Sequence, residues 1–548
     1  MFLIEMGTNI IYANKVLGEY EPIERTNNKD IIENYLTDES SLFRGKADEV
    51  VFPKNELQIA QILKEANNKK VLVTISGAGT GLTGARIPLG GIVLSTQKLT
   101  RLTGRGLRER EKLIEYTEMG KKYEIYVGKD SEKGEFYAVC PAGIPGEILN
   151  NMIAGEGLYY PPLPTELTAF IGGTVATNAS GARTFHYGTT RDYIRRLRVV
   201  LPNGDILDVK RGQVKADEKG TFQIIFTSGE EITVELPKIR MPNVKKNSAG
   251  YYVKPEMDLI DLFVGSEGTL GVISEVEVRL VTKPAIVVPI FAHFEEEEKA
   301  LEFVKKLREE SKELNILSIE YFDINSVKII KRKYSSSIIP DKSNYIVFFE
   351  QKLSSEKEMC LLEKVYGLLN EYSNLDATAS LDPDWIKQSK EIRHYMPEQV
   401  TGFFRSHRLP KPKLSTDIAV PAESFDKMMN HYHEVTEEVG APYVLYGHIG
   451  DYHLHLNFLP TNEQQVKDSM EACIRLCREA VKLGGTVTAE HGVGKKTYTE
   501  NGKVKPLIEI MYGEEGVIEM AKMKHTFDPN HILNIGNILT AEILEIVK

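Results

Sequence analysis

The stretch VLVTISGAGTGLTGARIPLGGIVLS, residues 71–95, decides the fold of this 548-residue chain. Two short apolar runs at its ends predict buried strands, and the loop between them, residues 76–84, contains four glycines. Upstream, residues 49–52 predict another strand, and residues 55–67 predict an amphipathic helix with most of its apolar side chains on one face. A strand, a helix and a strand in this order form an α/β unit.

The glycine loop offers backbone groups rather than side chains. Successive glycines let backbone N–H groups turn inward and approach an anion such as a pyrophosphate. The loop lacks the Gly-Lys-Ser/Thr of a Walker loop, and it leads into a strand instead of opening the long helix of a dinucleotide-binding fingerprint. A tight turn between two strands is the alternative explanation for the loop taken alone.

Two further segments, residues 159–194 and 265–275, are also rich in glycine and other small residues. Such segments cannot build a side-chain core, so their backbone is expected to lie close to something else. Three such loops within about 200 residues predict one large, flat ligand with a polar tail.

Composition excludes several classes of protein. The 68 basic and 78 acidic side chains give a net charge of −10 without a basic stripe, which argues against nucleic-acid binding. The four cysteines contain no CxxC pair, which excludes an in-chain four-thiolate iron–sulfur cluster and a cysteine-rich zinc module. The chain shows neither an apolar run of about 18 residues nor a secretory signal. We expect a cytoplasmic protein, with peripheral contact at a membrane left open.

A second cluster of polar residues lies in YGHIGDYHLHLNFLP, residues 446–460. Side chains alternate along a strand, so His453, His455 and Asn457 are predicted to share one face of the run HLHLNF. His448 precedes a glycine turn and can fold back toward His455.

Glu490 and His491 leave a later apolar strand in TVTAEHGVG, residues 486–494. Two imidazoles and a carboxylate make a site for zinc or a related divalent metal, with a coordination position left open. Solvated or mutually hydrogen-bonded histidines are the alternative on spacing alone.

On these motifs, from about residue 45 to 540, the chain resembles FAD-dependent oxidoreductases of the vanillyl-alcohol-oxidase type with a PCMH-type FAD domain. The closest resemblance is to the D-lactate, glycolate and D-2-hydroxyglutarate dehydrogenases. It implies an α+β fold with three parts. These are a two-subdomain FAD-binding domain (1–283), a substrate or cap domain with an antiparallel sheet (284–480) and a C-terminal segment that completes the active site (481–548).

The resemblance also implies where FAD binds. No histidine stands in residues 76–86, so the flavin is expected to be held without a covalent bond. The family usually has Arg where Ser76 stands, Asn where Thr174 stands and Pro-Gly-Lys at residues 535–537. The residues that the resemblance assigns to FAD are Ser76, Gly77, Ala78, Gly79, Thr80, Gly81, Gly84, Pro141, Gly143, Thr165, Gly172, Gly173, Thr177, Asn178, Gly181, Ile273 and Asn537.

In the same family the positions of His448, His455 and Glu490 bind a divalent metal, which is Zn or else Fe or Mn. The position of His491 supplies the general base, and that of Asn457 contacts substrate. Where the family commonly reads Gly-Asp-Gly-Asn-Leu-His, this chain reads Gly-Asp-Tyr-His-Leu-His, so His453 is an additional imidazole whose role is open.

Two cations are expected to bind the substrate. Arg393 matches the arginine that binds the substrate carboxylate, although a surface helix arginine is the plainer explanation from spacing alone. The family's second cation, a lysine, would fall at or near Ser415, and we assign it to Lys413, with Lys411 as the neighbouring candidate. Other sources of charge are Arg405, His407 and Arg408. Without a basic group here, preference would shift from diacids such as 2-hydroxyglutarate toward monoacids such as lactate.

The predicted function is therefore FAD- and metal-dependent oxidation of a D-2-hydroxy acid, resembling D-lactate, to the 2-oxo acid. Hydride would pass to the flavin, and electrons would pass to an external electron-transfer flavoprotein, quinone, cytochrome or iron–sulfur partner. Four alternatives are a flavin oxidase, a dehydrogenase for another alcohol or a sugar, a metal-dependent hydrolase and a non-catalytic flavin-binding subunit. The sequence leaves a homodimer open.

Overall fold

The strands predicted on either side of the glycine loop pair in a small sheet. In the computed structural model, which describes residues 8–15, 22–406 and 413–548, β4 and β3 run parallel to β5, and β2 pairs antiparallel at the edge. These strands are Glu24–Thr26 (β2), Glu49–Phe52 (β3), Val73–Ser76 (β4) and Ile92–Ser95 (β5). The predicted α/β unit is confirmed.

Helix α2 (Glu56–Lys69) connects β3 to β4. The side chain of Asn55 caps its first turn by accepting a backbone N–H, which satisfies one of the donors that a helix start leaves free. Ile59 and Leu63 lie on one face, are fully buried, and join the core that contains the strands. A 3-10 turn, Thr96–Lys98, and the short helix α1 (Lys29–Glu33) complete this subdomain.

A seven-stranded antiparallel sheet, ordered β11-β10-β14-β8-β7-β6 with β9 beside β14, forms the second subdomain of the first lobe. The charged excursion at residues 104–137 contributes the edge hairpin of this sheet. Its strands are Glu111–Glu118 (β6), Lys121–Lys129 (β7), Phe136–Pro141 (β8), Leu158–Tyr159 (β9), Ile194–Val200 (β10), Ile206–Lys210 (β11) and Val272–Thr282 (β14).

The rest of this lobe consists of short helices, a three-stranded sheet and the loops between them. The sheet is ordered β1-β12-β13. These elements are Ile10–Tyr12 (β1), Gly146–Ala154 (α3), Ile171–Ala176 (α4), Thr184–Tyr187 (α5), Thr190–Tyr193 (α6), Thr221–Ile225 (β12), Glu231–Glu235 (β13) and Ile260–Phe263 (α7).

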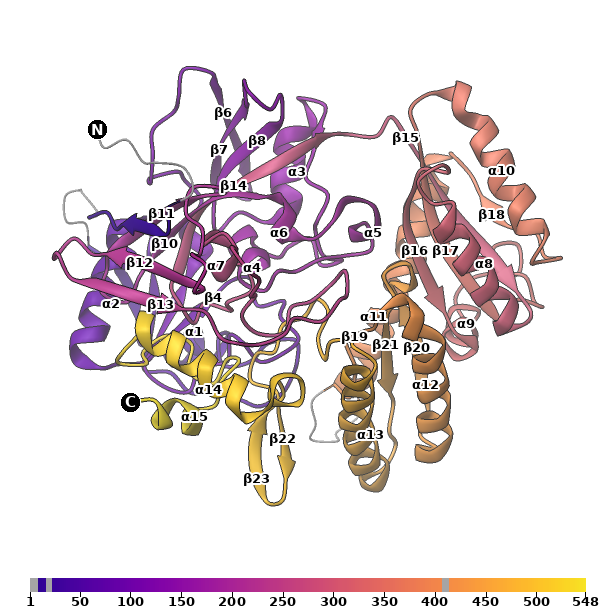
Figure 1. Cartoon of the computed structure of the whole chain (residues 1–548). Helices are drawn as coiled ribbons and strands as arrows, with labels where there is room; N and C mark the ends of the chain where they lie inside the picture. Colours follow the sequence, from indigo (N-terminus) through magenta and orange to yellow (C-terminus); the bar gives the residue numbers. More distant parts are fainter. Residues whose placement is uncertain (1–7, 16–21, 407–412) are drawn as a thin grey trace.

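The second lobe is built on another seven-stranded antiparallel sheet, ordered β18-β15-β17-β16-β20-β21-β19 (Figure 1). Its strands are Ile286–Phe294 (β15), Ile316–Phe322 (β16), Tyr345–Leu353 (β17), Thr378–Ala379 (β18), Ile418–Ala419 (β19), Tyr443–Gly447 (β20) and His453–Phe458 (β21). Both faces of this sheet are covered. In β17, Val347 and Phe349 join one core while Phe348 joins another, which is the alternation expected of a strand.

Helices cover this sheet on both faces. Buried residues of α8, α10, α12 and α13 belong to the larger core, and those of α9 and α11 belong to the smaller one. The helices are Glu297–Glu309 (α8), Ile324–Ile330 (α9), Met359–Asn370 (α10), Pro383–Ser406 (α11), Phe425–Val439 (α12) and Glu463–Lys482 (α13).

The C-terminal segment returns to the first lobe (Figure 1). It contains the hairpin of β22 (Thr497–Glu500) and β23 (Lys503–Pro506), followed by α14 (Glu509–Phe527) and α15 (Ala541–Ile546). The N–H of Val73 in β4 donates to the carbonyl of Ile532 at 2.8 Å, so the chain after α14 extends the glycine-loop sheet. The fold is therefore the α+β arrangement that was predicted.

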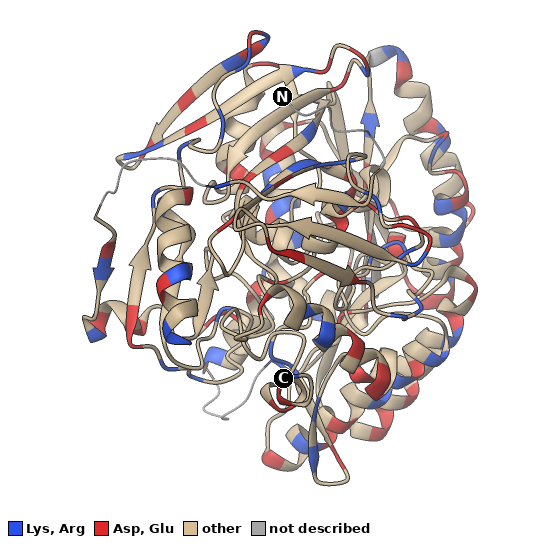
Figure 2. Cartoon of the chain, turned by 60° about the vertical axis from the view of Figure 1, so that its left-hand side comes forward, with Lys and Arg blue, Asp and Glu red and all other residues tan. Residues whose placement is uncertain are grey.

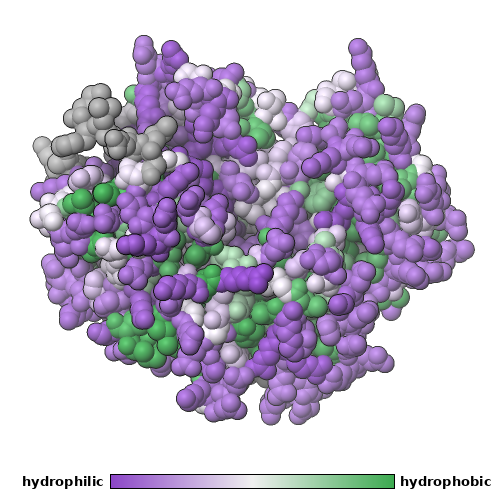
Figure 3. Space-filling model, in the orientation of Figure 1, coloured by the Kyte–Doolittle hydropathy of each residue, from purple (hydrophilic) through white to green (hydrophobic). Residues whose placement is uncertain are grey.

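The outer surface is mixed in charge and mostly hydrophilic. Acidic and basic residues alternate over the helices in Figure 2, and Figure 3 shows a notch between the two lobes at the top of the view. Among the described helices, none has both the length and the apolarity needed to cross a bilayer.

A buried ion pair joins the two lobes. Arg183, just before α5, donates from Nε and Nη2 to the two carboxylate oxygens of Glu350 in β17, each at 2.7 Å. Ser318 also donates to this carboxylate, and Arg183 donates to Tyr159 Oη at 2.9 Å. Burial alone would raise the pKa of Glu350, but Arg183 lowers that pKa to about 2.

We predict that Arg183→Met lowers the free energy of unfolding by about 3 kcal/mol at pH 7, because it leaves the Glu350 carboxylate buried without its cation. The double variant Arg183→Met/Glu350→Gln should recover most of this loss. Since the pKa of Glu350 is depressed in the folded state, the pair stabilises the protein above about pH 4.5, and this contribution fades as the pH falls toward 2. Urea unfolding across this range measures both effects, and equal stability of the wild type and Arg183→Met at pH 7 would contradict the prediction.

Candidate active site

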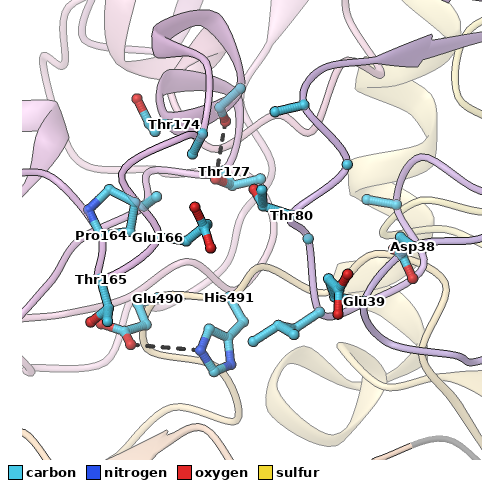
Figure 4. Close-up of a pocket in the computed structure, with 18 of the residues that line it drawn as sticks. Asp38, Glu39, Thr80, Pro164, Thr165, Glu166, Thr174, Thr177, Glu490 and His491 are labelled. Atoms are coloured by element: carbon cyan, nitrogen blue, oxygen red, sulfur yellow. Dashed lines mark hydrogen bonds and ion pairs between the residues drawn. The ribbon is translucent and has the colours of Figure 1, made fainter. Parts of the chain in front are cut away.

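A cavity of about 850 Å³ lies where the two lobes and the C-terminal segment meet. Its wall at one end is the glycine loop, and its wall at the other end is formed by β20, β21 and the loop that carries Glu490 and His491. The close-up in Figure 4 shows Thr80, Thr165 and Thr177 around the same space as Glu490 and His491. The predicted flavin loops and the predicted histidine cluster therefore face one cavity.

The glycine loop lines the cavity with Gly77, Ala78, Gly79, Thr80 and Gly81. Gly79 has a φ of +88°, in the left-handed region that favours glycine. A Cβ at this position would lie 2.2 Å from Nη1 of Arg86, so only glycine leaves room for that guanidinium.

Arg86 is a cation beside the glycine loop that the sequence analysis did not single out. It lines the cavity, and its Nη1 lies 3.4 Å from Oγ of Ser76. Its Nε donates to the carbonyl of Thr37 at 2.9 Å, and its Nη2 donates to the carbonyl of Asn34. The remaining N–H donors of the guanidinium are unused by these bonds. A positive charge thus stands next to Ser76, where the related proteins usually have arginine.

The other two small-residue segments supply the facing walls. Thr165, Gly172, Gly173, Thr177 and Ile273 line the cavity. A Cβ on Gly173 would meet nothing within 4 Å, so this residue opens onto the cavity. A Cβ on Gly172 would lie 2.6 Å from that of Ala142, which makes Gly172 a close-packing residue as well.

Other residues assigned to FAD support the lining loops without lining the cavity. Gly143 packs so closely that a Cβ would lie 2.2 Å from the carbonyl of Thr96. Asn178 accepts the N–H of Arg191 at 3.0 Å, and Asn537 donates to the carbonyl of Glu267 at 3.1 Å. The predicted residues outside the lining are Ser76, Gly84, Pro141, Gly143, Asn178, Gly181 and Asn537.

At the opposite end, one carboxylate oxygen of Glu490, Oε1, faces the Nε2 atoms of three histidines. The separations are 3.3 Å to His448, 3.5 Å to His455 and 3.6 Å to His491. His448 and His455 come from the end of β20 and from β21, while Glu490 and His491 come from the C-terminal segment. Residues more than thirty positions apart thus converge on one point.

Buried carboxylates behind the histidines set their orientation. Nδ1 of His448 lies 3.2 Å from Oε1 of Glu320, and Nδ1 of His491 lies 3.5 Å from Oδ2 of Asp417. A ring that directs Nδ1–H toward a carboxylate presents the lone pair of Nε2 on its other side. The cluster therefore gathers three imidazole nitrogens around Glu490.

Lys246 neutralises part of this negative charge. Its side chain is fully buried, and its Nζ lies 3.1 Å from Oε2 of Glu490 and donates to the carbonyl of Gly181 at 3.0 Å. Burial alone would raise the pKa of Glu490, but Lys246 and then His448 hold it well below its ordinary value. Because Lys246 occupies Oε2, the other oxygen, Oε1, is left to face the histidines.

Burial lowers the pKa of His491 to about 4. Its imidazole is therefore neutral at physiological pH and can accept a proton. The backbone N–H of His491 donates to Oδ2 of Asp417 at 2.8 Å, which fixes the residue beside the cluster.

The predicted substrate-binding residues all line the cavity, but they differ in how they are held. Arg393, in α11, donates from Nε to Oε1 of Glu320 at 2.9 Å. Asn457 is buried in β21. Lys413 donates from Nζ to Oγ1 of Thr401 at 2.8 Å, and burial lowers its pKa.

Of the other predicted cations, Arg405 also lines the cavity. Arg405 pairs with the carboxylate of Glu39 at 3.0 Å. His407, Arg408 and Lys411 lie outside the described residues.

Sequence reasoning missed Asp417, Glu320, Lys246 and Arg86. Asp417 follows the expected cation position near Ser415, and an acid directly before the apolar residues 418–420 was the available signal. The contacts of Glu320 and Lys246 depend on long-range packing that no local pattern indicates.

Comparison with known families decides the class of protein. A model described as the FAD binding domain matches residues 47–115 and 126–210, and one described as the C-terminal domain of FAD linked oxidases matches residues 283–538. The chain belongs to the FAD-linked oxidases. It is thus an FAD-dependent oxidoreductase. The FAD-binding model leaves out residues 116–125, which belong to the hairpin of β6 and β7.

Curated relatives of this FAD-linked oxidase match nearly its whole length. A D-lactate dehydrogenase of Archaeoglobus fulgidus is 28% identical over 89% of this chain and 91% of its own. Glycolate oxidase subunit GlcD of Bacillus subtilis is 26% identical over 93% and 92%. A D-2-hydroxyglutarate dehydrogenase of Stutzerimonas stutzeri is 25% identical over 95% and 97%.

A solved structure supports the fold. An alkyldihydroxyacetonephosphate synthase has a TM-score of 0.58 and 15% identity, covering 93% of this chain and 81% of that one.

Proposed function

We propose that this FAD-linked oxidase is a divalent-metal-dependent dehydrogenase that oxidises a small D-2-hydroxy monocarboxylate, such as D-lactate, to the 2-oxo acid. The observation that carries the proposal is a single cavity with glycine-rich loops at one end and the His448–His455–Glu490 cluster at the other. Arg393 lines the same cavity. An acid that spans the cluster and Arg393 would present its α-carbon toward the flavin-binding end.

The glycine-loop end fits FAD. Gly77 to Gly81 and Gly173 expose backbone to the cavity, which suits close approach of a pyrophosphate and a flat ring. Arg86 adds a positive charge beside that backbone. When bound, FAD supplies the hydride acceptor, which is the cofactor's own chemistry. No histidine lies between residues 76 and 86, in keeping with non-covalent binding.

The cluster fits a divalent cation. His448, His455 and Glu490 are buried and offer two imidazole nitrogens and one carboxylate oxygen, a set typical of catalytic zinc and also used for iron or manganese. A cation held there supplies Lewis-acid polarisation of the substrate hydroxyl.

His491 takes the hydroxyl proton at Nε2. Its ring stacks on that of His455 with centroids 5.2 Å apart, so it lies beside the cluster. The carboxylate of Asp417 on the Nδ1 side stabilises the imidazolium that forms, since opposite charge favours the protonated ring.

Arg393 binds the substrate carboxylate. Its Nε is already engaged by Glu320, so the two terminal nitrogens are left to form the parallel hydrogen bonds that a carboxylate accepts. Ser415, which lines the cavity, is neutral, and Lys413 is engaged with Thr401. Arg405 also lines the cavity and pairs with Glu39, so both further cations already have protein partners, which favours a substrate with one carboxylate over a diacid.

Electrons then leave the flavin for an external acceptor. The four candidates are an electron-transfer flavoprotein, a quinone, a cytochrome and an iron–sulfur protein. One relative from Arabidopsis thaliana, 24% identical, is named mitochondrial D-lactate dehydrogenase (cytochrome).

Anaerobic mixing of the metal-replete holoprotein with single acids tests this function. We expect D-lactate to bleach the flavin absorbance, L-lactate to leave it unchanged, and D-2-hydroxyglutarate to react with a kcat/KM at least about tenfold lower, because Lys413 and Arg405 already have protein partners. Equal rates with D-lactate and D-2-hydroxyglutarate would contradict the preference for monoacids. Bleaching by none of these acids or by glycolate would remove the hydroxy-acid assignment, and hydrogen peroxide formed in air would identify an oxidase.

His491→Gln is the matched variant for the same experiment. It should keep FAD bound but reduce the flavin about a hundred- to ten-thousandfold more slowly, which is the usual contribution of a general base.

We also predict that Arg86→Met releases FAD about ten- to a hundredfold faster than the wild type, because a charge-assisted contact to the pyrophosphate is lost. Release is followed by the rise of flavin fluorescence after dilution of the holoprotein. Riboflavin, which has no pyrophosphate, should bind both proteins equally well. Arg44→Met is the control. Arg44 is an exposed arginine of the N-terminal segment that Arg86 contacts, and it pairs with Glu33. Unchanged release of FAD from Arg86→Met would exclude this role.

A further inference from the structure

His453 belongs to the cluster, although the family motif has asparagine at its position. The atoms of His448, His453, His455 and Glu490 that can bind a metal all lie within 4.8 Å of one another. His453 is fully buried, and the centroid of its ring is 4.5 Å from that of His455 and 5.4 Å from that of His448.

We propose that His453 is a third imidazole ligand, and thus a fourth protein ligand, of the metal in this chain. The inference rests on the proposed function, because it concerns the same cation. It goes beyond that function by assigning a role to a residue that distinguishes this chain from the pattern of its relatives.

The hydrogen bonds of His453 fix which nitrogen faces the cluster. Nε2 lies 2.7 Å from Oδ1 of Asp417. The other oxygen of Asp417 accepts hydrogen bonds from Thr488 Oγ1 at 2.6 Å and from the N–H of His491 at 2.8 Å. An ionised carboxylate can only accept, so Nε2 of His453 carries the ring proton and donates it in this hydrogen bond. Nδ1 therefore carries the lone pair.

That lone pair has no hydrogen-bond partner. Nδ1 of His453 is buried and unpartnered among the described residues, and it lies 3.9 Å from Oε2 of Glu490, beyond hydrogen-bond distance. Oε2 of Glu490 already has Lys246 as its partner, so the buried lone pair of His453 needs a cation of its own to offset its desolvation. Two ligand atoms about 2.1 Å from one zinc ion at tetrahedral angles are about 3.4 Å apart, close to the separations in the cluster.

The arrangement Asp417–His453 is also the one that orients metal-binding histidines. Such a histidine usually donates its second ring N–H to a carboxylate, which fixes the tautomer and strengthens the ligand. An asparagine at residue 453 would have no ring N–H to donate to Asp417 and no second ring nitrogen to bind a metal. A merely packed histidine would not need its remaining nitrogen to face Glu490.

A third imidazole would change the properties of the site. With four protein ligands, a four-coordinate ion would have no position left for the substrate, so substrate would bind only if the ion accepted a further ligand. It also holds the metal more tightly against chelators.

Cobalt substitution counts the imidazoles directly. Each histidine bound to Co2+ gives one solvent-exchangeable ring N–H signal, shifted by the unpaired electrons, in the proton NMR spectrum of the holoprotein. We expect three such signals in the wild type and two in His453→Asn. His431→Asn, in a partly exposed histidine on α12, is the control and should keep three. In chelator competition, His453→Asn should lose Co2+ at least about tenfold more readily.

The outcomes separate the two claims. Two shifted signals in the wild type overturn the role of His453 while leaving a metal in the cluster, and this count needs no variant to fold. Three signals that persist in His453→Asn also overturn it. The absence of any shifted signal overturns both this inference and the metal dependence in the proposed function.

Discussion

The carboxylate of Asp417 is the constraint on which the site depends. It lies just before β19, and its two oxygens take hydrogen bonds from His453 in β21 and from Thr488, Glu490 and His491 in the C-terminal segment. Burial alone would raise the pKa of Asp417, but His491 and then His453 hold it well below its ordinary value. A buried carboxylate with this many donors fixes the position of the loop that carries both the predicted metal ligand and the predicted base. Without it, Glu490 and His491 would have no fixed relation to the strand that carries His455.

Glu320 fixes the side chains on the other side of the cluster. One oxygen, Oε1, lies 2.9 Å from Nε of Arg393 and 3.2 Å from Nδ1 of His448. The group proposed to bind the substrate carboxylate and a proposed metal ligand thus share one buried acid. Burial would raise the pKa of Glu320, but Arg393 and then His448 hold it well below its ordinary value, so the acid stays ionised. β16 lies in the middle of the seven-stranded sheet of the second lobe, so the sheet holds Glu320 in place.

The sequence predicted the local parts of this structure and left out the long-range ones. The glycine loop, the strand HLHLNF and the pair Glu490–His491 are short patterns whose geometry follows from alternation and from glycine. The roles of Gly143 and Gly173 could not be separated in this way, because one packs against a carbonyl and the other opens onto the cavity. Asp417 and Glu320 reach the histidines only because the order β16-β20-β21-β19 places their strands side by side. Arg86 could not be found either, since its position is fixed by carbonyls of the N-terminal segment.

The central claim is that the flavin end and the histidine end of one cavity act on the same substrate molecule. The direct measurement is the anaerobic rate of flavin bleaching by D-lactate in the holoprotein, before and after removal of the metal by a chelator, with bound FAD measured in both samples. We predict that chelation leaves FAD bound and abolishes bleaching, and that returning the divalent metal restores the rate. Bleaching at the same rate in the metal-free protein would contradict it, because the cluster would then have no part in the oxidation.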